Sequence, residues 1–117
     1  MSFDWNDYVS LAADLNLGSP TDAQMRSATS RAYYGAFIQC RNKMGKSMKK
    51  EGAIHQEIIK DFKASDQSEE VSIGNLLDDL RQRRNDADYY GFFVPTQSAT
   101  NLDIDKAKMI IANLKLI

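Results

Sequence analysis

Apolar side chains recur at intervals of three and four residues along almost the whole chain, and this periodicity constrains the fold more than any other feature. The chain has only two prolines, and no stretch alternates apolar and polar residues between turn residues as a strand would. The spacing therefore predicts an all-α fold, an antiparallel four- to five-helix up-and-down bundle. At 117 residues, we expect residues 1–117 to form a single helical domain.

Turn-forming and polar residues divide this pattern into five helical segments. The expected helices cover approximately residues 4–17, 21–47, 53–64, 69–90 and 102–116. Thr21 or Asp22 can cap the second helix, and Gly18 and Pro20 separate it from the first. In the first helix the spacing predicts one buried stripe, which consists of Trp5, Tyr8, Leu11, Ala12 and Leu15.

One charged residue interrupts the apolar seam of the fourth segment. The seam reads Ile73, Leu77, Leu80, Arg84, Ala87 and Gly91. Burying an unpaired guanidinium is unfavourable, so either an acid neutralises Arg84 or its side chain faces a cleft that receives an anion. Asp88 lies one turn later on the same face and can form a structural ion pair with Arg84. The sequence leaves both interpretations open.

A strip of polar residues runs beside this seam. Arg81, Asn85 and Asp88 follow one another at steps of four and three, which places them on one line of the helix surface. Because the strip borders Arg84, we expect Asn85 and Asp88 to share its surroundings. The same spacing predicts that Arg83 is exposed to solvent.

Tyrosines and a further arginine accompany this polar strip. Tyr89 and Tyr90 close the fourth segment, where their hydroxyls can donate to a phosphate and their rings can stack on a base. Arg31 and Tyr34 share an edge of the second segment and are further candidates for ligand contact. Packing in the core is the competing interpretation for these aromatic residues.

Charge and composition exclude several classes of protein. A net charge of −1 argues against a protein that coats nucleic acid nonspecifically, although residues 41–50 carry five cations and no acid. This basic run fits either a solvated helix end or a patch that contacts phosphate. No apolar stretch is long enough for a membrane span, and no secretory signal is visible. The lone Cys40, inside an apolar stripe, favours a cytoplasmic protein.

Metal and cofactor chemistry has little support in the sequence. His55 is the only histidine, and its place at the border of an apolar stripe favours a packed or capping residue over a catalyst. There is no cysteine pair and no acidic array with the spacing of a calcium loop. The chain also lacks a phosphate-binding glycine loop and a serine elbow. We therefore expect no metal and no cofactor.

Two strings together resemble the HEPN domain family, in particular its small stand-alone branch. The first is SRAYYGAF at residues 30–37, and the second is Leu80 followed by RNDADY at residues 84–89. His55 followed by Phe62 is similar to a histidine and a phenylalanine that recur in the intervening helix of that branch. The resemblance covers residues of about 21–114.

This resemblance implies a helical homodimer in which two copies of the late helix face a shared cleft that binds RNA or a nucleotide. Many members are metal-independent endoribonucleases of toxin–antitoxin or defence systems, and some act beside a nucleotidyltransferase antitoxin. Their signature is an arginine, often a following polar residue, and a histidine after four to six intervening positions. Arg84 and Asn85 match the first two, whereas Tyr89 stands where the histidine would fall.

The resemblance therefore implies a set of site residues and leaves one rival function. Arg84, Asn85 and Tyr89 are the catalytic candidates. An arginine can stabilise the negative charge of a phosphate, whereas a phenol in place of the histidine is a weak proton acceptor at neutral pH and argues against cleavage. The candidates for ligand binding are Arg31, Tyr34, Asp88 and Tyr90. The alternative is a non-catalytic helical interaction module in which Arg84 and Asp88 are a structural ion pair.

Overall fold

The computed structural model describes residues 2–45 and 51–117 of the chain. These residues form five α-helices and no strand, which confirms the predicted all-α fold. The helices are α1 (Asn6–Leu15), α2 (Asp22–Met44), α3 (Glu51–Lys63), α4 (Ser68–Tyr89) and α5 (Gln97–Leu114).

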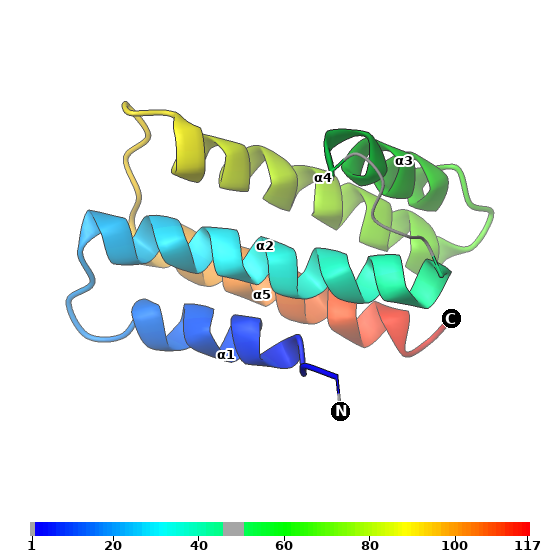
Figure 1. The fold of residues 1–117 in the computed structure, drawn as a ribbon, viewed down its shortest axis with the longest axis horizontal. Coiled ribbons are helices and arrows are strands. Elements are labelled where there is room, and N and C mark those ends of the chain that lie inside the picture. The colour runs from blue at the N-terminus through cyan, green and yellow to red at the C-terminus, as the bar shows by residue number, and fades with distance from the viewer. Residues whose placement is uncertain (1, 46–50) are drawn as a thin grey trace.

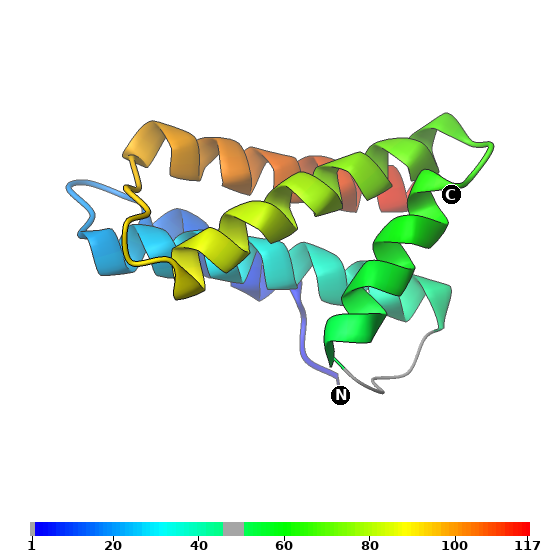
Figure 2. The same ribbon diagram turned by 90° about the horizontal axis from the view of Figure 1, so that it is seen from above.

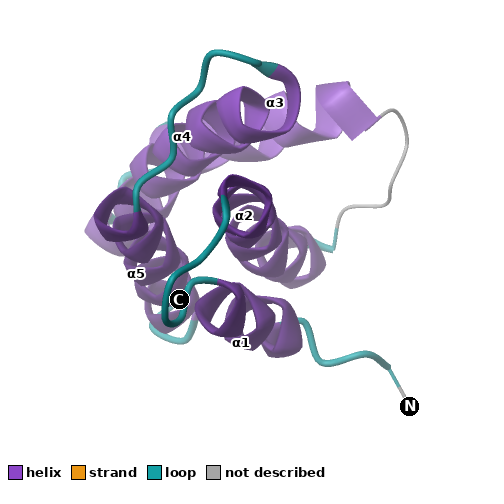
Figure 3. Ribbon diagram, turned by 90° about the vertical axis from the view of Figure 1, so that its left-hand side faces the viewer, coloured by secondary structure: helices purple, strands orange, loops and turns teal. Residues whose placement is uncertain are grey.

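Four of the helices lie along one another, and the fifth crosses them. α1 runs antiparallel to α2, and α4 runs antiparallel to both α2 and α5 (Figure 1). α3 lies across one end of this bundle and packs mainly against α4 (Figure 2). Seen from the end of the bundle, α2 occupies the middle, with α1, α5 and α4 around it (Figure 3). Residues of α2 therefore contact every other helix.

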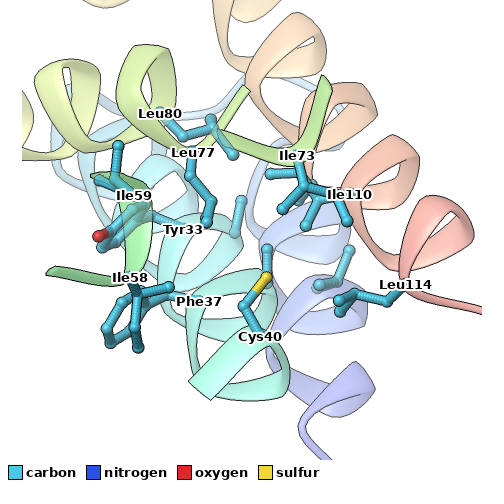
Figure 4. Packing of buried hydrophobic residues seen from close by; sticks show 14 of the residues in the cluster. Tyr33, Phe37, Cys40, Ile58, Ile59, Ile73, Leu77, Leu80, Ile110 and Leu114 are labelled. Carbon is cyan, nitrogen blue, oxygen red and sulfur yellow. The ribbon is translucent and has the colours of Figure 1, made fainter. Parts of the chain in front are cut away.

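Small residues on α2 allow this central position. Three alanines spaced four residues apart, Ala28, Ala32 and Ala36, are completely buried, so neighbouring helices can approach closely. Larger side chains fill the space on one side of this line. Tyr33 and Phe37 of α2 lie close to apolar side chains of α3 and α4 in the core (Figure 4). The core is one continuous cluster with members from all five helices.

Most helix ends lie near their expected positions, and the main exception is α5. α2 begins after Thr21, whose side chain accepts a hydrogen bond from the Gln24 amide while Gln24 reaches back to the Thr21 amide. The expected end of α2 near residue 47 and the basic connection after it fall partly outside the described residues. α5 starts at Gln97, five residues earlier than predicted, because Thr96 caps it through the Ala99 amide at 3.1 Å.

The predicted stripe of α1 is partly wrong. Ala12 is buried, but Leu11 is 43% exposed, and Val9, which lies outside the predicted stripe, is buried instead. Gly35 of α2 explains the difference, since a Cβ at this position would lie 2.8 Å from Cγ2 of Val9. The absent side chain lets α1 approach α2 through Val9 and turns Leu11 toward solvent.

A second glycine holds α3 close to α4 and leads to a prediction. A Cβ on Gly74 would lie 2.7 Å from the backbone nitrogen of Lys63, so α3 would have to shift. We expect Gly74→Ala to lower the free energy of unfolding by about 2 kcal/mol in urea titrations. Overpacking against backbone costs up to ~3 kcal/mol, and the higher helix propensity of alanine returns ~1 kcal/mol.

Gly91 provides the matched control for this substitution. An added Cβ at Gly91 would meet nothing within 4 Å. Gly91→Ala should therefore change the free energy of unfolding by less than about 0.5 kcal/mol. Equal effects at Gly74 and Gly91 would contradict the close approach of α3 and α4.

Candidate functional site

Arg84 lies on the C-terminal half of α4, where this helix faces α2. Its side chain is only 13% exposed. The Nη1 group donates to Oδ1 of Asn85 at 2.9 Å, and the Nη2 group donates to the hydroxyl of Tyr34 on α2. The predicted neighbour Asn85 and the ligand candidate Tyr34 are therefore in direct contact with the guanidinium, and they hold it in one orientation.

Asp88 completes the surroundings of this guanidinium. Nε of Arg84 lies 3.1 Å from Oδ2 of Asp88, an ion-pair distance, but the angle is too poor for a hydrogen bond. The side chain of Asp88 is 25% exposed, and its Oδ2 also accepts a hydrogen bond from the Ser30 hydroxyl at 3.1 Å. The ion pair between Arg84 and Asp88 is thus present, at the edge of the core and not inside it.

Aromatic rings flank the guanidinium of Arg84. Its Cζ lies 4.7 Å from the ring centre of Tyr34 and 5.6 Å from that of Tyr89. Tyr89 is 76% exposed, so most of its surface is open to solvent. We call Tyr34, Arg84, Asn85, Asp88 and Tyr89 the Arg84 cluster.

Of the two remaining candidate residues, Arg31 lies beside the cluster and Tyr90 lies outside it. Arg31 stands over the ring of Tyr34 at 5.7 Å and over that of Tyr8 at 4.8 Å, so the ring of Tyr34 lies near two guanidinium groups. Tyr90 is 54% exposed and packs edge-on against Phe92, away from the contacts that define the cluster. The structure thus brings Arg31 next to the cluster and places Tyr90 in the following loop.

His55 lies behind the cluster, inside the core. It is 2% exposed, its ring stacks on Phe37 at 3.9 Å, and Nδ1 lies 2.6 Å from the hydroxyl of Tyr33. Burial raises the pKa of Tyr33 far above its ordinary value, although the nearby Arg81 and Arg84 charges lower it in part. The structure therefore agrees with a packed role for His55.

Cys40 is also a packed residue. It is completely buried, and burial raises the pKa of its thiol to about 12. The thiolate that would act as a nucleophile is therefore scarce at neutral pH.

The prediction of a solvent-exposed Arg83 is wrong. Its side chain is 28% exposed, and its Nε and Nη2 donate to the carboxylate of Asp103 on α5 at 3.0–3.1 Å. Asp103 is 2% exposed and also accepts from the Thr29 hydroxyl at 2.8 Å. Because this network joins α2, α4 and α5, the spacing within one helix could not indicate it.

Arg26 is a second arginine whose role the sequence did not indicate. It extends from α2 and donates to the backbone oxygens of Ala87, Tyr90 and Phe93 at 2.8–3.1 Å. The last turn of α4 contains no basic residue, so Arg26 satisfies carbonyls that the helix leaves free. It fixes the loop that follows Tyr89.

Comparisons with profiles of protein families, with curated proteins and with solved structures give no match for this chain. Across residues 2–45 and 51–117, no group of three or more histidine, cysteine or acidic side chains is arranged to hold a metal ion. Within the same ranges, no helix combines the length and apolar character needed to cross a membrane. The HEPN resemblance therefore rests on the residues quoted above.

Proposed function

We propose that this chain is a HEPN-like protein that binds RNA or a nucleotide through the Arg84 cluster. Arg84 contacts a phosphate, and the ring of Tyr89 stacks on an adjacent base. The observation that carries the proposal is a guanidinium held in a fixed orientation beside an aromatic ring that is 76% exposed. Aromatic rings next to cations are the usual elements of single-strand binding sites.

Charge around the cluster supports the same function. Arg31 places a second guanidinium 5.7 Å from the ring centre of Tyr34, whereas Asp88 offsets only one positive charge. Two arginines therefore lie near the ring of Tyr34, and Asp88 is paired with one of them, Arg84. Such a surplus of positive charge favours an anionic ligand.

The proposal includes a homodimer, as the family resemblance implies. Several large apolar side chains that follow the cluster in the chain are more than half exposed, namely those of Tyr90, Phe92 and Val94. Contiguous exposed apolar groups are typical of surfaces that bind another protein. A second copy seated on them would bring two Arg84 clusters together, and a nucleotidyltransferase antitoxin is the further partner that the family suggests.

A non-catalytic interaction module is the second candidate function. It is favoured by the fact that each of the three guanidinium nitrogens of Arg84 lies against a protein acceptor. In this case Arg84 and Asp88 stabilise the contact of α2 with α4 and take no ligand. The two functions differ in whether RNA binding depends on Arg84 and Tyr89.

Fluorescence anisotropy with a labelled single-stranded RNA tests the proposed function. We expect the natural chain to bind and Tyr89→Ala to bind about five-fold or more weakly, because stacking on one base contributes ~1–3 kcal/mol. Leu116→Ala, which truncates an apolar side chain that is 70% exposed near the C-terminus, is the control and should bind like the natural chain. If the natural chain did not bind the labelled RNA, this result would contradict the proposal.

The same protein in EDTA tests whether the site also cuts. We expect binding without cleavage, because the phenol of Tyr89 is a poor proton acceptor and His55 is buried. Cleavage that appears in Tyr89→His would identify a site that lacks only its base. Cleavage by the natural chain, lost in Arg84→Ala, would assign metal-independent endoribonuclease activity to this cluster.

A further inference from the structure

A groove separate from the Arg84 cluster lies between α3 and α4. Its volume is about 430 Å³, within the range of pockets that hold small molecules. Among the side chains that line it are Gln56, Ile59, Lys60 and Lys63 from α3 and Asp78 and Arg81 from α4.

The groove carries an excess of positive charge. Three of its side chains are cationic, and Asp78 is the single carboxylate among the lining residues. Asp78 is already paired with Lys63. Within residues 2–45 and 51–117, the side chains of Lys60 and Arg81 make no hydrogen bond or ion pair. Two cations thus share one concave site whose single carboxylate is already paired with Lys63.

The side chain of Arg81 has a buried donor that lacks an acceptor. Its Nε is buried and has no hydrogen-bond partner in the part of the chain that the structure describes. Buried donors in folded proteins nearly always have a partner, and the exceptions concentrate at functional positions. Arg81 is one of the residues that line the groove, so an anionic ligand there can accept from its guanidinium.

We propose that the α3–α4 groove binds a phosphorylated small molecule, with Arg81 and Lys60 on its phosphate and Ile59 against its apolar part. A phosphate monoester is close to a dianion at neutral pH and matches two unpaired cations. The guanidinium also offers a planar set of donors that fits phosphate oxygens. Ile59 is 6% exposed, and together with the amide of Gln56 it offers contacts beyond the phosphate.

This inference does not depend on the proposed RNA-binding function. Arg81 and Arg84 lie one turn apart on α4, but Arg84 is not among the residues that line the groove. The groove opens between α3 and α4, whereas the Arg84 cluster lies between α2 and α4. Either site can therefore be present without the other.

Titration of ¹⁵N-labelled protein with adenosine 5′-monophosphate, followed by amide chemical shifts, tests the groove. We expect saturable shifts at Ile59, Lys60 and Arg81 at low ionic strength. Lys60→Gln and Arg81→Gln should each raise the Kd about ten-fold, since a hydrogen bond to a charged group is lost. Lys108→Gln removes an exposed lysine on α5 and should leave the Kd unchanged within about two-fold.

A parallel titration with inorganic phosphate separates the two sources of this ligand chemistry. Weaker binding of phosphate than of the nucleotide supports the proposal, including the contact with Ile59. Equal binding would reject the contact with Ile59 and leave the groove as a site for free phosphate. No saturable shift up to about 10 mM of either probe would overturn the proposal. Shifts confined to the surroundings of Arg84, or insensitive to Lys60→Gln, would overturn it as well. Lys60 is exposed, so its substitution keeps the test valid if Arg81→Gln fails to fold.

Discussion

Replacing Arg83 with methionine is expected to lower the free energy of unfolding by about 3 kcal/mol. The substitution keeps most of the apolar stem of Arg83 but leaves the carboxylate of Asp103 without its cation. Asp103 is 2% exposed, and the hydroxyl of Thr29 would be its one remaining side-chain donor in the described part of the chain. An uncompensated charge in this position is far more costly than the loss of an ion pair at the surface.

Urea unfolding followed by circular dichroism provides the measurement, and two further variants control it. Gln82→Met changes the exposed neighbour of Arg83 and should alter the free energy of unfolding by less than about 0.5 kcal/mol. The double variant Arg83→Met with Asp103→Leu removes both charges and should recover most of the loss. A double variant that stays as unstable as the single one would count against a buried ion pair as the cause.

Replacing Arg84 with alanine is expected to impair both RNA binding and stability. Loss of the phosphate contact should weaken binding about ten- to a hundred-fold, since a hydrogen bond to a charged group contributes ~1.5–3 kcal/mol. The free energy of unfolding should fall by about 2 kcal/mol, because Asp88 loses its cation while Tyr34 and Asn85 lose a donor. This loss is smaller than at Arg83 because Asp88 is 25% exposed and water can solvate it.

A double variant separates the two roles of Arg84. Arg84→Met with Asp88→Leu replaces the ion pair by apolar side chains and should restore most of the stability. We expect RNA binding to stay as weak as in Arg84→Ala, because the guanidinium is still absent. RNA bound by the double variant as tightly as by the natural chain would reject the phosphate contact. The interaction module would then be the better description.

The Arg84 cluster illustrates what spacing along one helix can predict. Asn85 and Asp88 follow Arg84 at one and four residues, so any α-helix brings them together whatever it packs against. Their contacts with the guanidinium are indeed present. Tyr34 comes from another helix, and the order of the chain alone did not specify its hydrogen bond to Arg84.

Residues that act between helices show the limit of the sequence. Arg26 and Arg83 each follow an acid by four residues, Asp22 and Asp79, yet the acceptors that they contact lie 20 or more residues away. His55 likewise joins the rings of α2 only because α3 crosses the end of the bundle. Which arginine is buried, and beside which carboxylate, depends on how the helices are rotated about their axes.

The sequence by itself determined the five helices and the seam around Arg84, since both follow from contacts within 3.6-residue turns. Only the tertiary structure decided that Val9, and not Leu11, faces α2, and that Arg83 is the cation of the buried network. It also decided that Lys60 and Arg81 share a groove. The reason is physical: periodicity specifies the apolar face of each helix, whereas close packing at positions such as Gly35 and Gly74 sets how those faces meet.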